Sequence, residues 1–102
     1  MRPRKELNDI FKQILGNDHV YFQPPENVKL KYDCIIYSLD SGDIQFADNK
    51  SYRYMRRYDV LYICKNPDSE LIDKIPQSFP LIRFNRFYAS EGLNHYSYTL
   101  YF

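Results

Sequence analysis

Arginines interleaved with aromatic side chains are the residues of this sequence whose types and spacing suggest a function. Arg53, Arg56 and Arg57 lie in a stretch rich in tyrosine, and Arg83 and Arg86 lie in a second stretch with tyrosine and phenylalanine. If the two stretches are neighbouring strands, these side chains form one patch on a sheet. Guanidinium groups bind phosphates and aromatic rings stack on bases, so such a patch fits nucleic-acid binding.

The same residue types fit two other uses. Arginine and tyrosine anchor protein–protein interfaces, and an ordinary solvated sheet face carries them in cross-strand pairs with acidic residues. The formal net charge is only +1, from 14 lysines and arginines against 13 aspartates and glutamates. This balance is not typical of a nucleic-acid-binding domain. We therefore favour an interface, with the solvated face as its main alternative.

No residues have the spacing of a metal site or a catalytic site. His19, His95, Cys34 and Cys64 include no closely spaced pair of ligands, and the aspartates between positions 40 and 48 lack the periodicity of a calcium loop. Nothing in the sequence links His95 to a nucleophile, and the three glycines lie too far apart for a phosphate-binding loop. We expect a protein that is not an enzyme and that uses no cofactor or metal.

Composition points to a small assembling domain. A chain of 102 residues forms one domain, here residues 1–102, with a core large enough to fold without disulfides. Eleven tyrosines exceed what so small a core needs, so some are expected at a surface that contacts other proteins. No apolar run is long enough for a membrane span, and the first residues lack the apolar core expected of a signal peptide. Cys34 and Cys64 fall in strand-like runs and are expected to be buried thiols in a reducing cytosol, linked only if their strands are neighbours.

The arginines and tyrosines must be positioned by helices and strands, and the sequence predicts an α+β fold for them. In this fold an antiparallel sheet is packed by an N-terminal helix and a short second helix. The first helix has an apolar face from Leu7 to Leu15 and ends at Gly16. The second begins with Asn66 as its cap and closes at Pro76. A C-terminal hairpin closes the fold. The expected ranges are helix 3–15, strands 19–23, 34–40 and 51–66, helix 66–76, and hairpin strands 81–88 and 95–102.

The stretch Ser51–Asn66 is expected to be the central strand. Its alternate residues from Tyr52 to Cys64 form an apolar face, and the opposite face becomes apolar only at Leu61 and Ile63, so a helix should cover its later half. Asp59 interrupts this strand and requires a partner unless it lies at an edge. The candidate partners are Arg57, Lys65 and Arg83.

Nearly the whole chain resembles the tail-terminator class of small proteins of long-tailed bacteriophages, which are encoded among the genes for head–tail joining and tail completion. The resemblance lies in the order and spacing of several runs rather than in one motif. One departure is Asp33, where similar proteins usually carry proline; aspartate restores a backbone donor and adds a charge. The runs that carry the resemblance are 31–40, 56–63, 65–75, 83–88 and 93–102.

What the resemblance implies is a ring, commonly a hexamer, at the head-proximal end of the tail tube. Such a ring stops tube growth and then binds the head–tail connector or stopper protein. The implied partners are other copies of the chain, the tail tube protein and that connector. A membrane and specific nucleic-acid binding are not implied. The protein would be made in the host cytoplasm and reside in the virion, at the head–tail interface.

We expect one set of residues at the contact between subunits, where one patch meets a different patch of the neighbour, and a second set at the contact with the tube or connector. Two functions remain as alternatives to a tail terminator. One is a neighbouring neck or head-closure ring protein, and the other is a small cytosolic nucleic-acid-binding module that uses the arginine and aromatic face. The expected subunit interface comprises Tyr52, Tyr54, Arg56, Tyr58, Arg83, Arg86 and Tyr88. The expected contact with the tube or connector, in the loop from Asp40 to Lys50, comprises Asp40, Asp43, Phe46 and Asp48.

Overall fold

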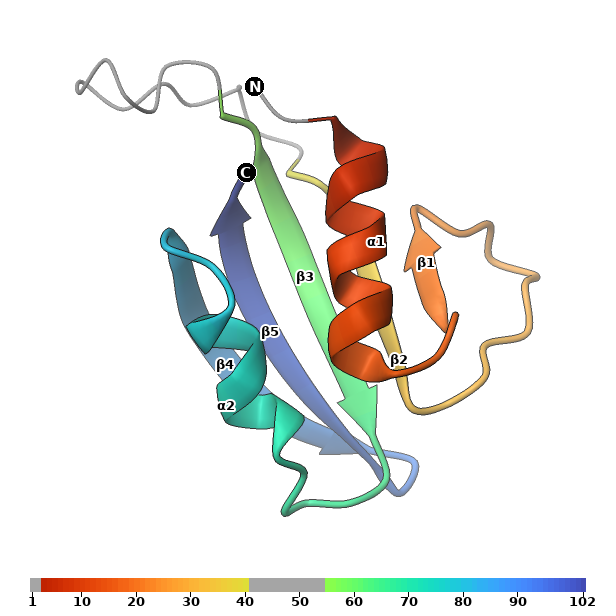
Figure 1. Ribbon diagram of the computed structural model, residues 1–102. Coiled ribbons are helices and arrows are strands. Elements are labelled where there is room, and N and C mark those ends of the chain that lie inside the picture. The colour runs from red at the N-terminus through yellow and green to blue at the C-terminus, as the bar shows by residue number, and fades with distance from the viewer. Residues whose placement is uncertain (1–2, 41–54) are drawn as a thin grey trace.

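Two helices cover one face of a five-stranded sheet in the computed structural model, which describes residues 3–40 and 55–102 (Figure 1). The sheet has the strand order β1-β2-β3-β5-β4, so β3 is central and β1 and β4 are the edges. The predicted α+β class, with an N-terminal helix and a C-terminal hairpin, is confirmed. The elements are α1 (Arg4–Leu15), β1 (Val20–Phe22), β2 (Cys34–Leu39), β3 (Arg57–Cys64), α2 (Leu71–Gln77), β4 (Ile82–Ser90) and β5 (Leu93–Tyr101).

The sheet is mixed rather than wholly antiparallel. β1 pairs with β2 in parallel, with Val20 opposite Ile35 and Phe22 opposite Tyr37, whereas the other three strand pairs are antiparallel. The prolines after Gln23 turn the chain away from the sheet, and the segment up to Asp33 returns it to the start of β2 (Figure 1). The two strands therefore run in the same direction. A parallel pair needs such a long connection, which the prediction of a simple antiparallel sheet did not include.

Alternation along β3 separates the two faces of the sheet. Tyr58, Val60 and Tyr62 are buried on the face toward the helices, as the predicted apolar face requires. Phe11 of α1 packs edge-on against Tyr37 of β2 and against Phe79, which follows α2, at ring-centroid distances of 5.2 and 5.6 Å. The core thus lies in one layer between the sheet and both helices.

Buried tyrosines connect the sheet to the helices through their hydroxyl groups. The Tyr37 hydroxyl donates to Oδ1 of Asn8 in α1 at 2.8 Å, and the Tyr62 hydroxyl lies 2.8 Å from Oγ of Ser69. Burial raises the pKa of Tyr37 and the pKa of Tyr62. It raises the pKa of Tyr98 to about 12, so these phenols stay protonated. A polar tip that finds a partner allows a tyrosine to fill a core.

The Tyr98 hydroxyl uses a carbonyl that α2 leaves free. Pro76 lies inside the last turn of α2 and has no N–H to donate to the carbonyl of Ile72, four residues earlier. The Tyr98 hydroxyl donates to that carbonyl oxygen at 3.0 Å. The sequence predicted that Pro76 would close the helix, whereas the helix extends to Gln77 because this carbonyl is satisfied from the sheet.

The start of α2 also differs from the prediction. Oδ1 of Asn66 accepts the N–H of Asp68 at 2.9 Å, which forms a turn rather than a cap. Oγ of Ser69 accepts the N–H of Leu71 at 3.2 Å, so the helix begins at Leu71, and Ser69 does what was expected of Asn66. By contrast, α1 ends as predicted, at Gly16 with φ of 79° and its N–H bonded to the Lys12 carbonyl at 2.9 Å.

Candidate interaction surface

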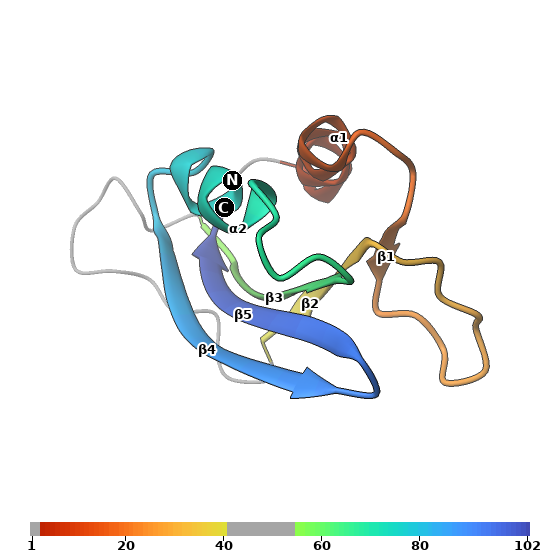
Figure 2. The same ribbon diagram turned by 90° about the horizontal axis from the view of Figure 1, so that it is seen from below.

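The face of the sheet opposite the helices is uncovered in the described part of the chain, and we call it the open face (Figure 2). The register places Asp59 of β3 beside Thr99 of β5, and Arg83 of β4 on the other side of Thr99. A single patch on paired strands required β3 and β4 to be neighbours, and they are not. Their arginines share the open face but are separated by β5.

A hollow of about 430 Å³ lies near the centre of the open face. The side chains of Ile36 and Leu61 form its apolar floor, and Val60, whose side chain points to the helix face, also lines it. Asp59 and Arg86 lie at its lining with opposite charges, together with the small hydroxyl side chains of two serines. An apolar floor with a few polar groups around it is the composition of a contact surface. The remaining lining residues are Ser38, Tyr88 and Ser97.

Arg86, Tyr88 and His95 form a stack along the open face. The guanidinium carbon of Arg86 lies 4.9 Å from the ring centroid of Tyr88. The Tyr88 ring is parallel to that of His95 within 10°, at a centroid distance of 4.5 Å. Cation–π contacts at exposed sites contribute about 0.5–1 kcal/mol, enough to orient an arginine. The stack holds the Arg86 charge and a tyrosine face in fixed positions on β4.

An ion pair connects the end of β2 to the start of β3. Nε of Arg57 lies 2.9 Å from Oδ2 of Asp40, and the N–H of Asp40 donates to the Arg57 carbonyl at 3.0 Å. Arg57 therefore pairs with Asp40 rather than with Asp59. Partial burial and the Asp40 charge raise the pKa of Asp59. The acidic side chain of Asp40, expected at the tube or connector, lies in this pair.

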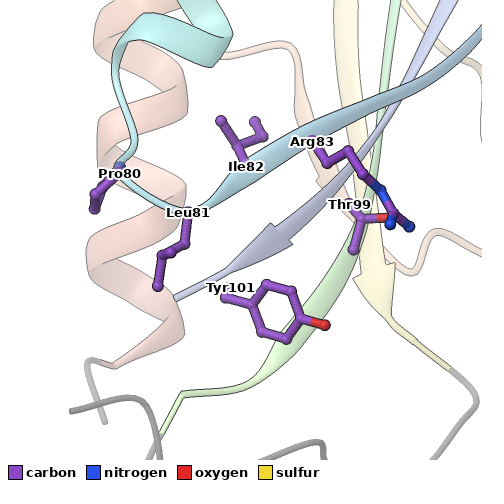
Figure 3. Close-up of a pocket in the computed structure, with 6 residues that line it drawn as sticks. All are labelled: Pro80, Leu81, Ile82, Arg83, Thr99 and Tyr101. Atoms are coloured by element: carbon purple, nitrogen blue, oxygen red, sulfur yellow. The ribbon is translucent and has the colours of Figure 1, made fainter. Parts of the chain in front are cut away.

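A second hollow, of about 250 Å³, lies where β4 begins beside the end of β5 (Figure 3). Arg83, Thr99 and Tyr101 contribute its open-face side. Between the two hollows, Nδ2 of Asn85 donates to Oγ1 of Thr99 at 2.7 Å, and Nε of Arg83 donates to Oδ1 of Asn85 at 3.3 Å. These bonds fix the Arg83 side chain at the rim. The other lining residues are Pro80, Leu81 and Ile82.

Edge strand β4 exposes two phenylalanines that a β-bulge brings to one side. Phe84 lies opposite Tyr98 and Arg86 opposite Ser97, so β4 contains one residue more than β5, at Asn85. Phe84 and Phe87 therefore both lie on the helix side, against the rings of Tyr98 and Tyr96, at centroid distances of 5.7 and 5.0 Å. Each is 50% exposed. We call this pair the β4 strip.

The structure separates the residues predicted for contacts with other proteins. Arg83, Arg86 and Tyr88 lie on the open face. Arg56 precedes β3, and its backbone N–H and carbonyl pair with Phe102 at 2.9 and 3.0 Å. Tyr58 is only 1% exposed, because it points into the core toward Tyr37, so its side chain does not belong to a surface. Tyr52, Tyr54, Asp43, Phe46 and Asp48 lie outside the described residues.

The histidines, cysteines and acidic residues of the described part of the chain do not gather into a metal site. Residues 3–40 and 55–102 contain no group of three or more His, Cys, Asp and Glu that could hold a metal ion. Both cysteines are free and buried, and burial raises the pKa of Cys34 to about 12. The strands are neighbours, but Cys34 lies opposite Ile63, so the two thiols are on opposite faces of the sheet. A thiol with this pKa is a poor nucleophile.

Two exposed apolar features were missed from the sequence. The β4 strip was not predicted, because Phe84 and Phe87 would lie on opposite faces of a regular strand. The segment Val28–Tyr32 alternates apolar and lysine residues, and this pattern could have indicated an extended surface segment. Val28 and Tyr32 are 39% and 37% exposed.

Comparisons of the chain with protein-family models, with characterised proteins and with solved structures found no match. No helix within residues 3–40 and 55–102 has the length and apolar character needed to cross a membrane. What the protein does is therefore argued from its own surface.

Proposed function

We propose that this protein is a structural virion protein of the tail-terminator type, which forms a ring at the head-proximal end of a phage tail tube. The observation that carries the proposal is a sheet covered by both helices on one face only, with a long edge strand that exposes aromatic rings and arginines. Exposed aromatic and arginine side chains are typical anchors of protein–protein interfaces. The order of elements also agrees with the order that the resemblance implies.

In this role the protein acts by binding and performs no reaction. Copies of the chain form the ring through β4, where Arg83, Arg86 and Tyr88 lie. The ring ends growth of the tail tube and then offers a surface to the connector below the capsid. Residues near Asp40, at the end of β2, would face the tube or the connector. A terminator and a neighbouring neck-ring protein differ in their binding partner, the tail tube or the connector.

The mass of the purified chain tests this proposal. Light scattering over a range of concentrations should give one species of several chains, and addition of tail tube protein should cap the tubes and limit their length. Arg86→Ala and Tyr88→Ala should weaken assembly, because they remove the stacked pair on β4, whereas Lys12→Ala on the exposed side of α1 should not. A monomer at all concentrations that leaves tube growth unchanged would overturn the proposal.

Nucleic-acid binding is a second candidate, favoured by one observation. The guanidinium of Arg86 stacked on Tyr88 combines a phosphate ligand with a ring that could accept a base. A phosphate binder loses affinity steeply as salt rises. Titration with single-stranded DNA and RNA at low and physiological salt separates the two functions. The ring protein should bind neither at physiological salt, while a nucleic-acid-binding module should retain measurable affinity.

A further inference from the structure

Two apolar surface patches lie at opposite edges of the sheet. The β4 strip, Phe84 and Phe87, lies on one edge strand. Val28 and Tyr32 lie in the connection that extends beyond β1, the other edge (Figure 2). These four residues are the large apolar side chains most exposed in the described part of the chain, together with Leu39 at the end of β2. Exposed apolar patches of this kind mark contacts with another molecule.

The charges around the two patches are complementary. The β4 strip lies on the side of the sheet that α2 covers, where two exposed acidic residues are found, Asp73 in α2 and Asp68 in the segment before it. At the other edge, the apolar residues of Val28–Tyr32 alternate with Lys29 and Lys31, which are exposed. An apolar centre with opposite charges at the rim favours one partner and orientation.

The segment Val28–Tyr32 is held in place on its own subunit. The N–H of Lys31 donates to the Tyr21 hydroxyl at 3.1 Å, and Oδ1 of Asp33 accepts the N–H of Lys65 at 3.0 Å. The segment is thus anchored to β1 near its end and to the end of β3 immediately after it. A surface that is already ordered loses little conformational entropy when it binds.

We propose that the β4 strip of one copy packs on Val28 and Tyr32 of the next copy, with Lys29 and Lys31 facing Asp68 and Asp73. The proposal rests on the assembly proposed above and specifies its interface. Because the two patches are different and lie at opposite edges, the contact is head-to-tail, and each subunit has one patch free until the ring closes. A two-fold contact would instead bring the same patch of two copies together.

Mixing two defective variants tests the head-to-tail contact. Phe84→Ser/Phe87→Ser removes one patch and Val28→Ser/Tyr32→Ser removes the other. Each variant alone should be monomeric by sedimentation velocity, at concentrations where the wild-type chain is fully assembled. Their mixture should form a complex of two chains and stop there, since one intact contact is possible and ring closure is not. Formation of that complex also shows that both variants are folded.

A matched control and a charge exchange sharpen the test. Leu39→Ser removes an equally exposed apolar residue outside both patches and should assemble as the wild type does. Lys29→Asp/Lys31→Asp should weaken assembly at least tenfold at low salt, and mixing it with Asp68→Lys/Asp73→Lys should restore full assembly, because both contacts of an alternating ring are then complementary in charge. Failure of this rescue would overturn the charge pairing.

The outcomes separate this interface from the proposed function. If the wild type assembles and both serine variants still assemble, the interface is wrong and the ring stands. If each variant is monomeric and their mixture is monomeric too, the contact is not head-to-tail. If the wild type itself is monomeric at every concentration, the proposed function fails and this interface with it.

Discussion

The two faces of the sheet use tyrosine in different ways. On the helix face, five tyrosines are buried, and three of them form hydrogen bonds with α1, α2 or the residues before α2 through their hydroxyl groups. On the open face, the Tyr88 ring lies between Arg86 and His95. The tyrosines are thus divided between the core and the surface. The number of aromatic residues does not measure the surface available to partners. The buried tyrosines are Tyr37, Tyr58, Tyr62, Tyr96 and Tyr98.

The difference between the two faces is tested most directly by removing one tyrosine from each. Tyr98→Ala should lower the free energy of unfolding by about 3–5 kcal/mol, because it leaves a large cavity beneath α2. Tyr101→Ala, on the neighbouring open-face position of β5, should cost about 1 kcal/mol or less. Urea unfolding of both variants at a concentration where the chain is monomeric measures the difference. Equal losses would contradict the difference between the two faces.

The hydroxyl contacts can be isolated from the ring contacts. Tyr98→Phe keeps the ring but leaves the Ile72 carbonyl without its donor, and should cost about 1–2 kcal/mol. In a Pro76→Ala background, residue 76 can supply the missing N–H, so the same substitution should cost less. A double-mutant cycle measured by urea unfolding gives the coupling. Additive effects of the two substitutions would contradict the role given to the hydroxyl.

The smallest effect expected concerns Asp59 on the open face. Its pKa is raised by partial burial and by Asp40, so the folded protein holds this proton more tightly than the unfolded chain does. The stability that Asp59 gains from this proton is present below the unfolded pKa, near 3.8, and is lost as pH rises through the raised value. Asp59→Asn should therefore be more stable than the wild type at pH 7, by about 0.5 kcal/mol or less because water screens the charge. This stability advantage of the variant, measured by thermal unfolding, should disappear near pH 3. An advantage that grows toward low pH would contradict the raised pKa of Asp59.

Locally determined features were predicted well. The apolar spacing of α1 and the left-handed Gly16 depend on neighbours within one or two helical turns, so the sequence was sufficient. The buried face of β3 follows from alternation alone. The hairpin was also predicted, although its strands are longer and only Glu91 and Gly92 form the turn, with φ of 54° and 78°.

Features that depend on distant partners were missed. Asn66 and Ser69 are both suitable caps, and only the contact between Ser69 and Tyr62 decides which one starts α2. The parallel pairing of β1 depends on the path of the chain from Gln23 to Asp33, which no local pattern specifies. Of the residues predicted for the interface, Arg83, Arg86 and Tyr88 lie on the open face, and their place in an interface stays a prediction. Tyr58 was assigned wrongly, because residue type does not tell which face of a strand a partner helix covers.

The bulge at Asn85 keeps both phenylalanines of the β4 strip on one side of the sheet. If the same residues paired regularly without a bulge, Phe84 and Phe87 would point away from each other, one of them into the open face. Deletion of Asn85 would instead leave one residue between the two rings, and a regular strand would then carry both on the helix side. The strand could therefore be one residue shorter and still present both rings to a neighbour.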